Sequence, residues 1–293
     1  MNKIIAIVCH KVTAPLVHTV KYLSSYNDNT VILHVDAKSN VNDFVFLSKT
    51  NVIILEDRVD IQWGRFSQIA ATLKLMEFSL KFNYSYFFLI SGDDIPVMSN
   101  DTIDAFLNDH MGKEFIHYQD SRNSYVDPEE RVKYLYPEAF YNRKSGITVS
   151  VTRKFHKIFK NILFINKNFT SNQHLFPKLF KGTNWFTLTK DAVQFIVEYT
   201  ENNKTFVSVF QHSLCADEVF FHSILKTKPN INIYHDDSAI NDALRYIDWV
   251  SGPEYPRVLN VVDLDKIKDS RALFARKISP TADQEFMNSF IRS

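Results

Sequence analysis

The chain has 293 residues and 45% of them are hydrophobic, which is enough for one large or two small α/β domains with a packed core. Its formal net charge is +1, so bulk electrostatics give no reason to expect a nucleic-acid partner. Six glycines leave few positions for a phosphate-binding loop, and neither the G-x-G-x-x-G nor the G-x-x-x-x-G-K-[ST] pattern is present.

The first apolar run, residues 4–8, predicts a buried strand. It resembles the apolar core of a signal peptide only superficially, because it is short and Cys9-His10-Lys11 follows without a small-residue cleavage site. Nowhere does the sequence approach the roughly eighteen consecutive apolar residues that a membrane-spanning helix needs. Cys9 and Cys215 both lie in apolar contexts, which is more typical of two buried thiols than of a disulfide. We therefore expect a protein of a reducing compartment, the cytoplasm.

Residues 15–23 predict a helix and residues 30–35 a second buried strand, a βαβ opening of the kind that builds parallel sheets. His10 and Asp36 directly follow the two strands, with Lys38 in the second loop. Both loops are expected at one crevice, where doubly wound folds bind nucleotides. Each residue also has a simpler explanation, which is a solvated loop for His10 and a helix cap for Asp36.

The chain is organised around an apolar, aromatic-rich run at residues 87–90, which fits a strand buried on both faces. Gly92 permits a turn and Pro96 forbids a continuing central strand. Between them stand Asp93 and Asp94, where the strand leaves the sheet. Because ligands of open α/β sheets bind at this edge, the two carboxylates are candidates for the floor of an active site. The alternative is an acidic turn that leads into the next helix.

A strand at residues 51–55 and a helix at residues 69–80 precede this run. Trp63 lies between them and either anchors the core or forms a wall of the pocket. Residues 119–146 are rich in charged and aromatic side chains, which is typical of a long functional loop that selects substrates.

A basic segment with interleaved Phe and Ile runs from Arg153 to Lys181. A solvated helix face is the favoured explanation. The alternative is a peripheral contact with anionic lipid at the inner face of the cell membrane, where each exposed Lys or Arg adds about 1 kcal/mol at most.

The remaining predicted elements are a strand at residues 181–189, a helix at 191–199, a helix at 214–225 and a last strand at 231–234. Asp217 and Glu218 stand at the head of the third of these elements. The helix dipole stabilises negative charge there by roughly 0.3–1 kcal/mol, so ordinary first-turn acids are an alternative to a catalytic pair.

Eight stretches resemble, in order, motifs of the core-2/I-branching β-1,6-N-acetylglucosaminyltransferase family, which also includes peptide O-xylosyltransferases and bacterial members. They span almost the whole chain and are Val8–Lys11, His34–Ser39, Trp63–Ser67, Ser91–Pro96, Gly182–Phe186, Ala216–Phe221, Leu244–Trp249 and Leu273–Lys277.

The resemblance implies an α/β fold of GT-A type with a central, mostly parallel sheet flanked by helices. It also implies an inverting transferase that uses a nucleotide sugar, usually a UDP-sugar, and needs no metal cofactor. We expect residues 1–293 to form a single domain, with a nucleotide-sugar-binding half at 1–118 and an acceptor-binding and catalytic half at 119–293. N-acetylglucosamine or xylose is the expected sugar, and the expected acceptor is a glycan or lipid-linked oligosaccharide.

The resemblance also implies roles for particular residues. Glu218 matches the catalytic base, with Asp217 orienting it or an acceptor hydroxyl. The cations matched to the departing diphosphate are Lys277 and, less securely, Arg257, with Arg245 and Arg276 as further candidates. His10, Asp36 and Lys38 are assigned to the nucleotide side, and Trp63, Asp93, Asp94 and Trp185 to the sugars.

Two departures from the family pattern matter. Secretory members carry a membrane anchor and several disulfides, whereas this chain starts at the first strand and has two cysteines, so it resembles a bacterial cytoplasmic member. The family often has another residue where Asp93 stands, which leaves open a metal-dependent enzyme that uses Asp93 and Asp94 as ligands. A non-catalytic module that binds sugar nucleotides or glycans is the alternative from a different class.

Overall fold

A computed structural model describes residues 1–142, 146–252 and 256–291. Its centre is a five-stranded sheet in the order β3-β2-β1-β4-β6, in which all neighbours are parallel except the antiparallel pair β4 and β6. The strands are β1 (Lys3–Cys9), β2 (Asn29–Val35), β3 (Val52–Ile54), β4 (Tyr86–Ser91) and β6 (Thr187–Thr189).

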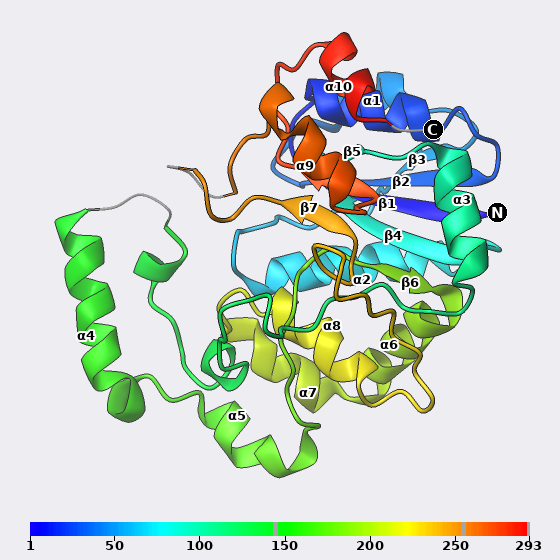
Figure 1. Ribbon diagram of the computed structural model, residues 1–293. Helices are drawn as coiled ribbons and strands as arrows, with labels where there is room; N and C mark the ends of the chain where they lie inside the picture. The colour runs from blue at the N-terminus through cyan, green and yellow to red at the C-terminus, as the bar shows by residue number, and fades with distance from the viewer. Residues whose placement is uncertain (143–145, 253–255, 292–293) are drawn as a thin grey trace.

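Helices cover both faces of this sheet (Figure 1). Ile4 and Ala6 of β1 belong to one core cluster, together with side chains of α2 (Phe66–Ser79), α6 (Lys190–Asn202) and α8 (Asp217–Leu225). Ile5 and Ile7 belong to a second cluster, together with side chains of α1 (Ala14–Leu23) and α3 (Asn100–Asp109). Alternation along one strand therefore supplies two cores, as expected for a strand buried on both faces.

A second, three-stranded sheet in the order β5-β8-β7 brings the end of the chain to the central sheet. Its strands are β5 (Ile95–Pro96), β7 (Arg245–Ile247) and β8 (Phe274–Arg276). A third core cluster packs this sheet against α9 (Leu264–Asp269) and α10 (Gln284–Phe290). Strand β5 directly follows the acidic turn at Asp93 and Asp94, and it pairs with β8. The acidic turn therefore lies beside the end of β8, where Arg276 and Lys277 stand.

The remaining helices are α4 (Ile147–Leu163), α5 (Lys167–Asn172) and α7 (Lys204–Val209). Helix α4 stands apart from the two sheets at the left of Figure 1. Short 3-10 helices are η1 (Val41–Leu47), η2 (Glu129–Arg131), η3 (Glu138–Phe140), η4 (Gln173–Leu175), η5 (Phe210–His212) and η6 (Val261–Asp263).

The predicted α/β class, the βαβ opening and the buried central strand are confirmed. Two predicted strands are wrong in extent or in kind. The segment predicted at 181–189 is a strand only at β6, because its first residues turn against α8. The segment predicted at 231–234 makes a single isolated bridge between Glu114 and Ile233, and β7 and β8 follow it.

Both cysteines are free thiols, and Cys9 is buried whereas Cys215 is partly exposed. No helix within the described ranges is both long and apolar enough to cross a bilayer.

Candidate active site

The carboxyl ends of β1, β2 and β4 meet at one edge of the central sheet. The amide of Asp36 donates to the carbonyl of Cys9 at 2.8 Å, and the amide of Gly92 donates to the carbonyl of Val8 at 3.0 Å. The loops after the three strands therefore lie side by side, at the edge where open α/β sheets bind ligands.

Two of the three residues assigned to the nucleotide side are engaged within these loops. Asp36 is buried, and its carboxylate accepts the backbone N–H groups of Lys38 at 3.0 Å and Ile61 at 3.4 Å. Lys38 forms ion pairs with Asp60 at 2.8 Å and with Asp36 at 3.5 Å. Asp36 thus stabilises a turn, while His10 stands exposed at the same edge.

The two carboxylates after β4 differ in environment. Asp94 is 1% exposed, accepts the backbone N–H of Ser91 and lies 3.2 Å from Nε of Arg276. Burial raises the pKa of Asp94, and the positive charge of Arg276 opposes that rise. Asp93 is half-buried, and its carbonyl accepts the amide of Ile278 at 3.1 Å. The acidic turn is therefore fastened to the chain that follows β8.

Arg276 contacts both this turn and the ring of Trp185. Its guanidinium carbon lies 4.8 Å from the ring centroid of Trp185, within the range of a cation–π contact. Lys277 follows directly, and its carbonyl accepts the amide of Leu259 at 2.8 Å. One of the tail cations matched to the diphosphate, Arg276, therefore stands beside a tryptophan assigned to the sugars.

Arg257 and Arg245, like Arg276, make contacts within the protein. Arg257 pairs with Asp248 at 2.9 Å and with Asp263, and so it fastens the loop after β7. Arg245 is 2% exposed and donates to main-chain carbonyls and to the Thr187 hydroxyl at 2.8 Å. Burial lowers the pKa of Arg245 to about 10, and the nearby negative charge of Asp94 opposes the shift.

Glu218 lies in the first turn of α8 between two cations. Its Oε2 is 3.0 Å from Nζ of Lys181 and 3.8 Å from Nη2 of Arg131. Its side chain keeps 29% of its surface exposed. The two cations come from distant parts of the chain and orient a carboxylate that still reaches solvent.

Gly182 explains how Lys181 comes so close to Glu218. The amide of Gly182 donates to the carbonyl of Glu218 at 2.9 Å. A Cβ at this position would lie 1.8 Å from the carbonyl oxygen of His117 and 2.3 Å from Nε2 of His222. Because no side chain fits there, the loop can press against the head of α8 only with glycine at this position.

Asp217 is buried directly beside Glu218. Burial, followed by the negative charge of Glu218, raises the pKa of Asp217. The Gln68 side-chain amide lies 3.5 Å from its carboxylate. Asp217 is therefore a buried carboxyl group whose charged form is disfavoured both by burial and by its neighbour Glu218.

A pocket of about 480 Å³ opens in front of Glu218. This volume is within the range of small-molecule sites. The lining includes both cations of the Glu218 pair and two tryptophans, Trp185 and Trp249. Such ring faces suit sugar rings, and they line the same pocket as Glu218.

Trp63 belongs to a separate pocket of about 530 Å³, which Arg65 and Tyr141 also line. It is 43% exposed, so the structure does not make it a core anchor. Gly64 adopts a φ of +76°, and its carbonyl accepts the amide of Cys215 at 2.7 Å. This turn ties the Trp63 pocket to the chain just before α8.

A model of the Core-2/I-Branching enzyme family matches residues 6–270. The chain belongs to this family. It is similar to the β-glucuronosyltransferase GlcAT14A of Arabidopsis thaliana, with 22% identity over 268 residues that cover 85% of this chain and 55% of the relative. It is also similar to xylosyltransferase 2 of Rattus norvegicus, with 22% identity over 283 residues that cover 89% of this chain and 30% of the relative.

This Core-2/I-branching chain thus spans about half of the first relative's length and less than a third of the second's. Among solved structures, the apo form of mouse xyloside xylosyltransferase 1 covers 98% of this chain and 99% of that chain at 9% identity. Its TM-score of 0.36 is too low to compare details.

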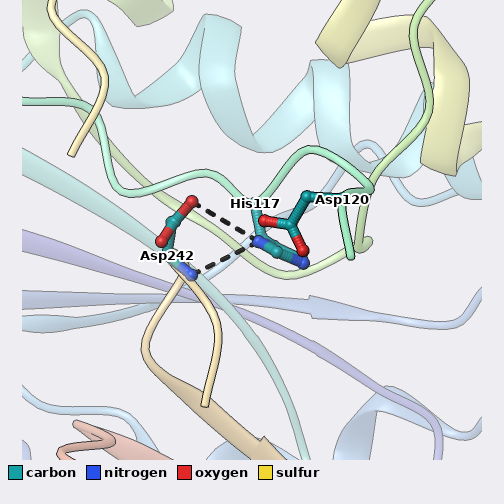
Figure 2. A group of neighbouring side chains, drawn as sticks. All are labelled: His117, Asp120 and Asp242. Atoms are coloured by element: carbon teal, nitrogen blue, oxygen red, sulfur yellow. Dashed lines mark hydrogen bonds and ion pairs between the residues drawn. The ribbon is translucent and has the colours of Figure 1, made fainter. Parts of the chain in front are cut away.

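His117, Asp120 and Asp242 form the cluster with metal-like spacing in the part of the chain that the structure describes (Figure 2). Their ligand atoms lie within 4.8 Å of one another. Nη2 of Arg122 already lies 2.7 Å from Asp120, 2.9 Å from Asp242 and 3.4 Å from Nδ1 of His117. A guanidinium therefore supplies the positive charge that this cluster needs, and the donor set does not fit a resident metal.

Sequence reasoning missed three residues of the Glu218 pocket in this family member: Arg131, Lys181 and Trp249. The sequence placed Lys181 on a solvated basic face, although it directly precedes the Gly182–Phe186 motif. Arg131 lies in a charged loop with no motif of its own. Trp249 ends the Leu244–Trp249 motif, so its motif could have pointed to it.

Proposed function

We propose that this chain is an inverting glycosyltransferase of GT-A type that moves a sugar from a UDP-sugar to a hydroxyl group of a glycan acceptor, without a metal ion. The observation that carries the proposal is Glu218, a partly exposed carboxylate held between Lys181 and Arg131 in a pocket lined by two tryptophans. Family membership supports the reaction class.

Inverting transfer needs one base, which takes the acceptor proton while the hydroxyl oxygen attacks the anomeric carbon from the face opposite the nucleotide. Glu218 is proposed as that base. Lys181 and Arg131 hold one oxygen of the carboxylate, and Asp217 and the head of α8 fix its position. The new bond joins the acceptor oxygen to the anomeric carbon, and the bond from that carbon to the diphosphate breaks.

The departing diphosphate needs fixed positive charge, which is usually the largest catalytic contribution. Arg276 and Lys277 are the proposed pair, since Arg276 contacts the ring of Trp185, which also lines the Glu218 pocket. Arg257 and Arg245 are assigned supporting roles because Arg257 pairs with two carboxylates, whereas Arg276 pairs with one, and because Arg245 is buried and donates to the backbone.

The proposed sugar is N-acetylglucosamine or xylose, and the proposed acceptor is a cell-surface glycan precursor. Several donor sugars must be tested, because one relative is named a β-glucuronosyltransferase and another a xylosyltransferase. Purified chain is therefore incubated with UDP-N-acetylglucosamine, UDP-xylose and UDP-glucuronic acid, with and without an acceptor panel. We expect UDP release to rise with one donor when a matching acceptor is present. Binding of a UDP-sugar with no release under any condition would favour a non-catalytic module.

Chelation separates the metal-independent proposal from the rival that uses Asp93 and Asp94 as ligands. Asp94 is buried against Arg276, which already neutralises it, and this arrangement favours the metal-independent reaction. We expect EDTA to leave turnover unchanged in the assay above. Loss of turnover that Mn²⁺ restores would contradict the proposal and support the rival.

A further inference from the structure

Helix α4 carries an exposed apolar stripe on the face turned away from the molecule. Residues at helical spacing form it, namely Ile147, Val151, Phe155, Ile158 and Ile162, with exposed fractions of 84%, 61%, 45%, 70% and 74%. Large apolar side chains exposed singly are ordinary, but five on one face of one helix are not.

The opposite face of α4 is already packed, so the stripe is not needed to hold the helix in place. His156 is buried, its ring centroid lies 4.7 Å from that of Phe140, and its Nε2 lies 3.1 Å from the carbonyl of Leu135. Lys160 pairs with Glu130 at 2.6 Å. These contacts fix α4 to the loop around η2 and η3 and leave the stripe facing outward, in agreement with the position of α4 at the edge of the molecule in Figure 1.

The charges of α4 have one sign. Arg153, Lys154 and Lys157 are exposed beside the stripe, and the sequence from Ile147 to Leu163 contains no Asp or Glu. A second copy of this face would bring only more cations, so it would not complement the charge. An anionic surface with an apolar interior complements both the cations and the stripe.

We propose that this face of α4 docks onto a lipid bilayer that contains anionic headgroups. The apolar stripe enters the boundary between headgroups and acyl chains, and Lys154 and Lys157 contact the headgroup charge. This inference concerns where the protein works, and it stands whether or not the chain transfers a sugar.

Two adjacent residues, Glu130 and Arg131, connect the docking face to the candidate active site. Helix η2 carries Glu130, which holds α4 through Lys160, and the next residue is Arg131, which lies 3.8 Å from Glu218. An enzyme bound in this way suits an acceptor that is itself carried on a lipid.

Flotation with vesicles tests the proposal on the full chain. We expect the wild type to float with phosphatidylcholine vesicles that contain phosphatidylglycerol and to stay behind with phosphatidylcholine alone. The double variant Ile158→Asp with Ile162→Asp should lower the partition coefficient at least about tenfold. Each of Lys154→Gln and Lys157→Gln should lower it up to about fivefold, and added salt should weaken binding in the same direction.

Val261→Asp with Val262→Asp is the matched control, since these two residues are 62% and 74% exposed on η6, a different element. This variant should float like the wild type, and circular dichroism should show that every variant is folded. Equal loss in the control, or equal flotation with neutral vesicles, would overturn the proposal. The proposal would also be overturned if the wild type did not bind vesicles and instead formed a dimer. Light scattering would then show a dimer for the wild type and a monomer for the variant Ile158→Asp with Ile162→Asp.

Discussion

Replacing Glu218 with Gln is expected to lower kcat for sugar transfer by about 10²–10⁴-fold and to leave the affinity for UDP unchanged. The amide keeps the size of the side chain but cannot take the acceptor proton. Because the diphosphate is assigned to Arg276 and Lys277, its binding does not depend on this carboxylate. Initial rates with the active donor and calorimetric titration with UDP measure the two quantities.

Glu198→Gln is the control for this variant, because Glu198 is exposed on α6 and hydrogen-bonds Gln194. It should keep wild-type values of kcat and of UDP affinity. Near-normal turnover by Glu218→Gln would remove Glu218 from the role of base. Loss of UDP binding together with turnover would instead assign Glu218 to the donor.

Replacing Asp94 with Ala is expected to lower the stability of the fold strongly. It leaves Arg276 without its partner at 3.2 Å and leaves the buried guanidinium of Arg245 without the nearby negative charge. Breaking a buried pair from one side costs about 3–5 kcal/mol, and for a chain of this size that lowers Tm by on the order of 6–10 °C. Thermal unfolding followed by circular dichroism measures the shift.

Asp93→Ala provides the comparison, since the neighbouring carboxylate is half-buried and its backbone carbonyl makes the bond to Ile278. Its Tm should stay within about 1 °C of the wild type, as is usual for changes outside buried networks. If both alanine variants keep their Tm but lose metal-stimulated turnover, the two aspartates are a ligand set and Asp94 does not stabilise the fold through Arg276.

The fold was predictable from the sequence for the strands that are buried on both faces of the sheet. Residues 4–8, 30–35 and 87–90 are continuous apolar runs, and such runs fit parallel strands covered on both faces. The sequence of residues 181–189 looks equally strand-like, yet its first part is used to press Gly182 against the carbonyl of His117. That close contact depends on a residue far away in the chain, so local pattern could not reveal it.

The candidate site was predictable where one motif carries the chemistry, and hidden where distant segments must meet. Glu218 stands in its own motif. Lys181 and Arg131 can be recognised as neighbours of Glu218 only from their distances in the structure. Arg257 shows the converse, since the family resemblance assigned it to the diphosphate, less securely than Lys277, and the structure pairs it with two carboxylates. Ion pairing is decided by three-dimensional proximity, which composition and spacing do not contain.

A crystal structure of the chain soaked with UDP and a divalent cation tests the central claim most directly. The account predicts the pyrophosphate within about 3 Å of the side chains of Arg276 or Lys277, with no metal ion between the phosphates and these side chains. The β-phosphate, which carries the sugar in a UDP-sugar, should face Glu218. A pyrophosphate coordinated to a cation at Asp93, or one bound away from the tail, would contradict it.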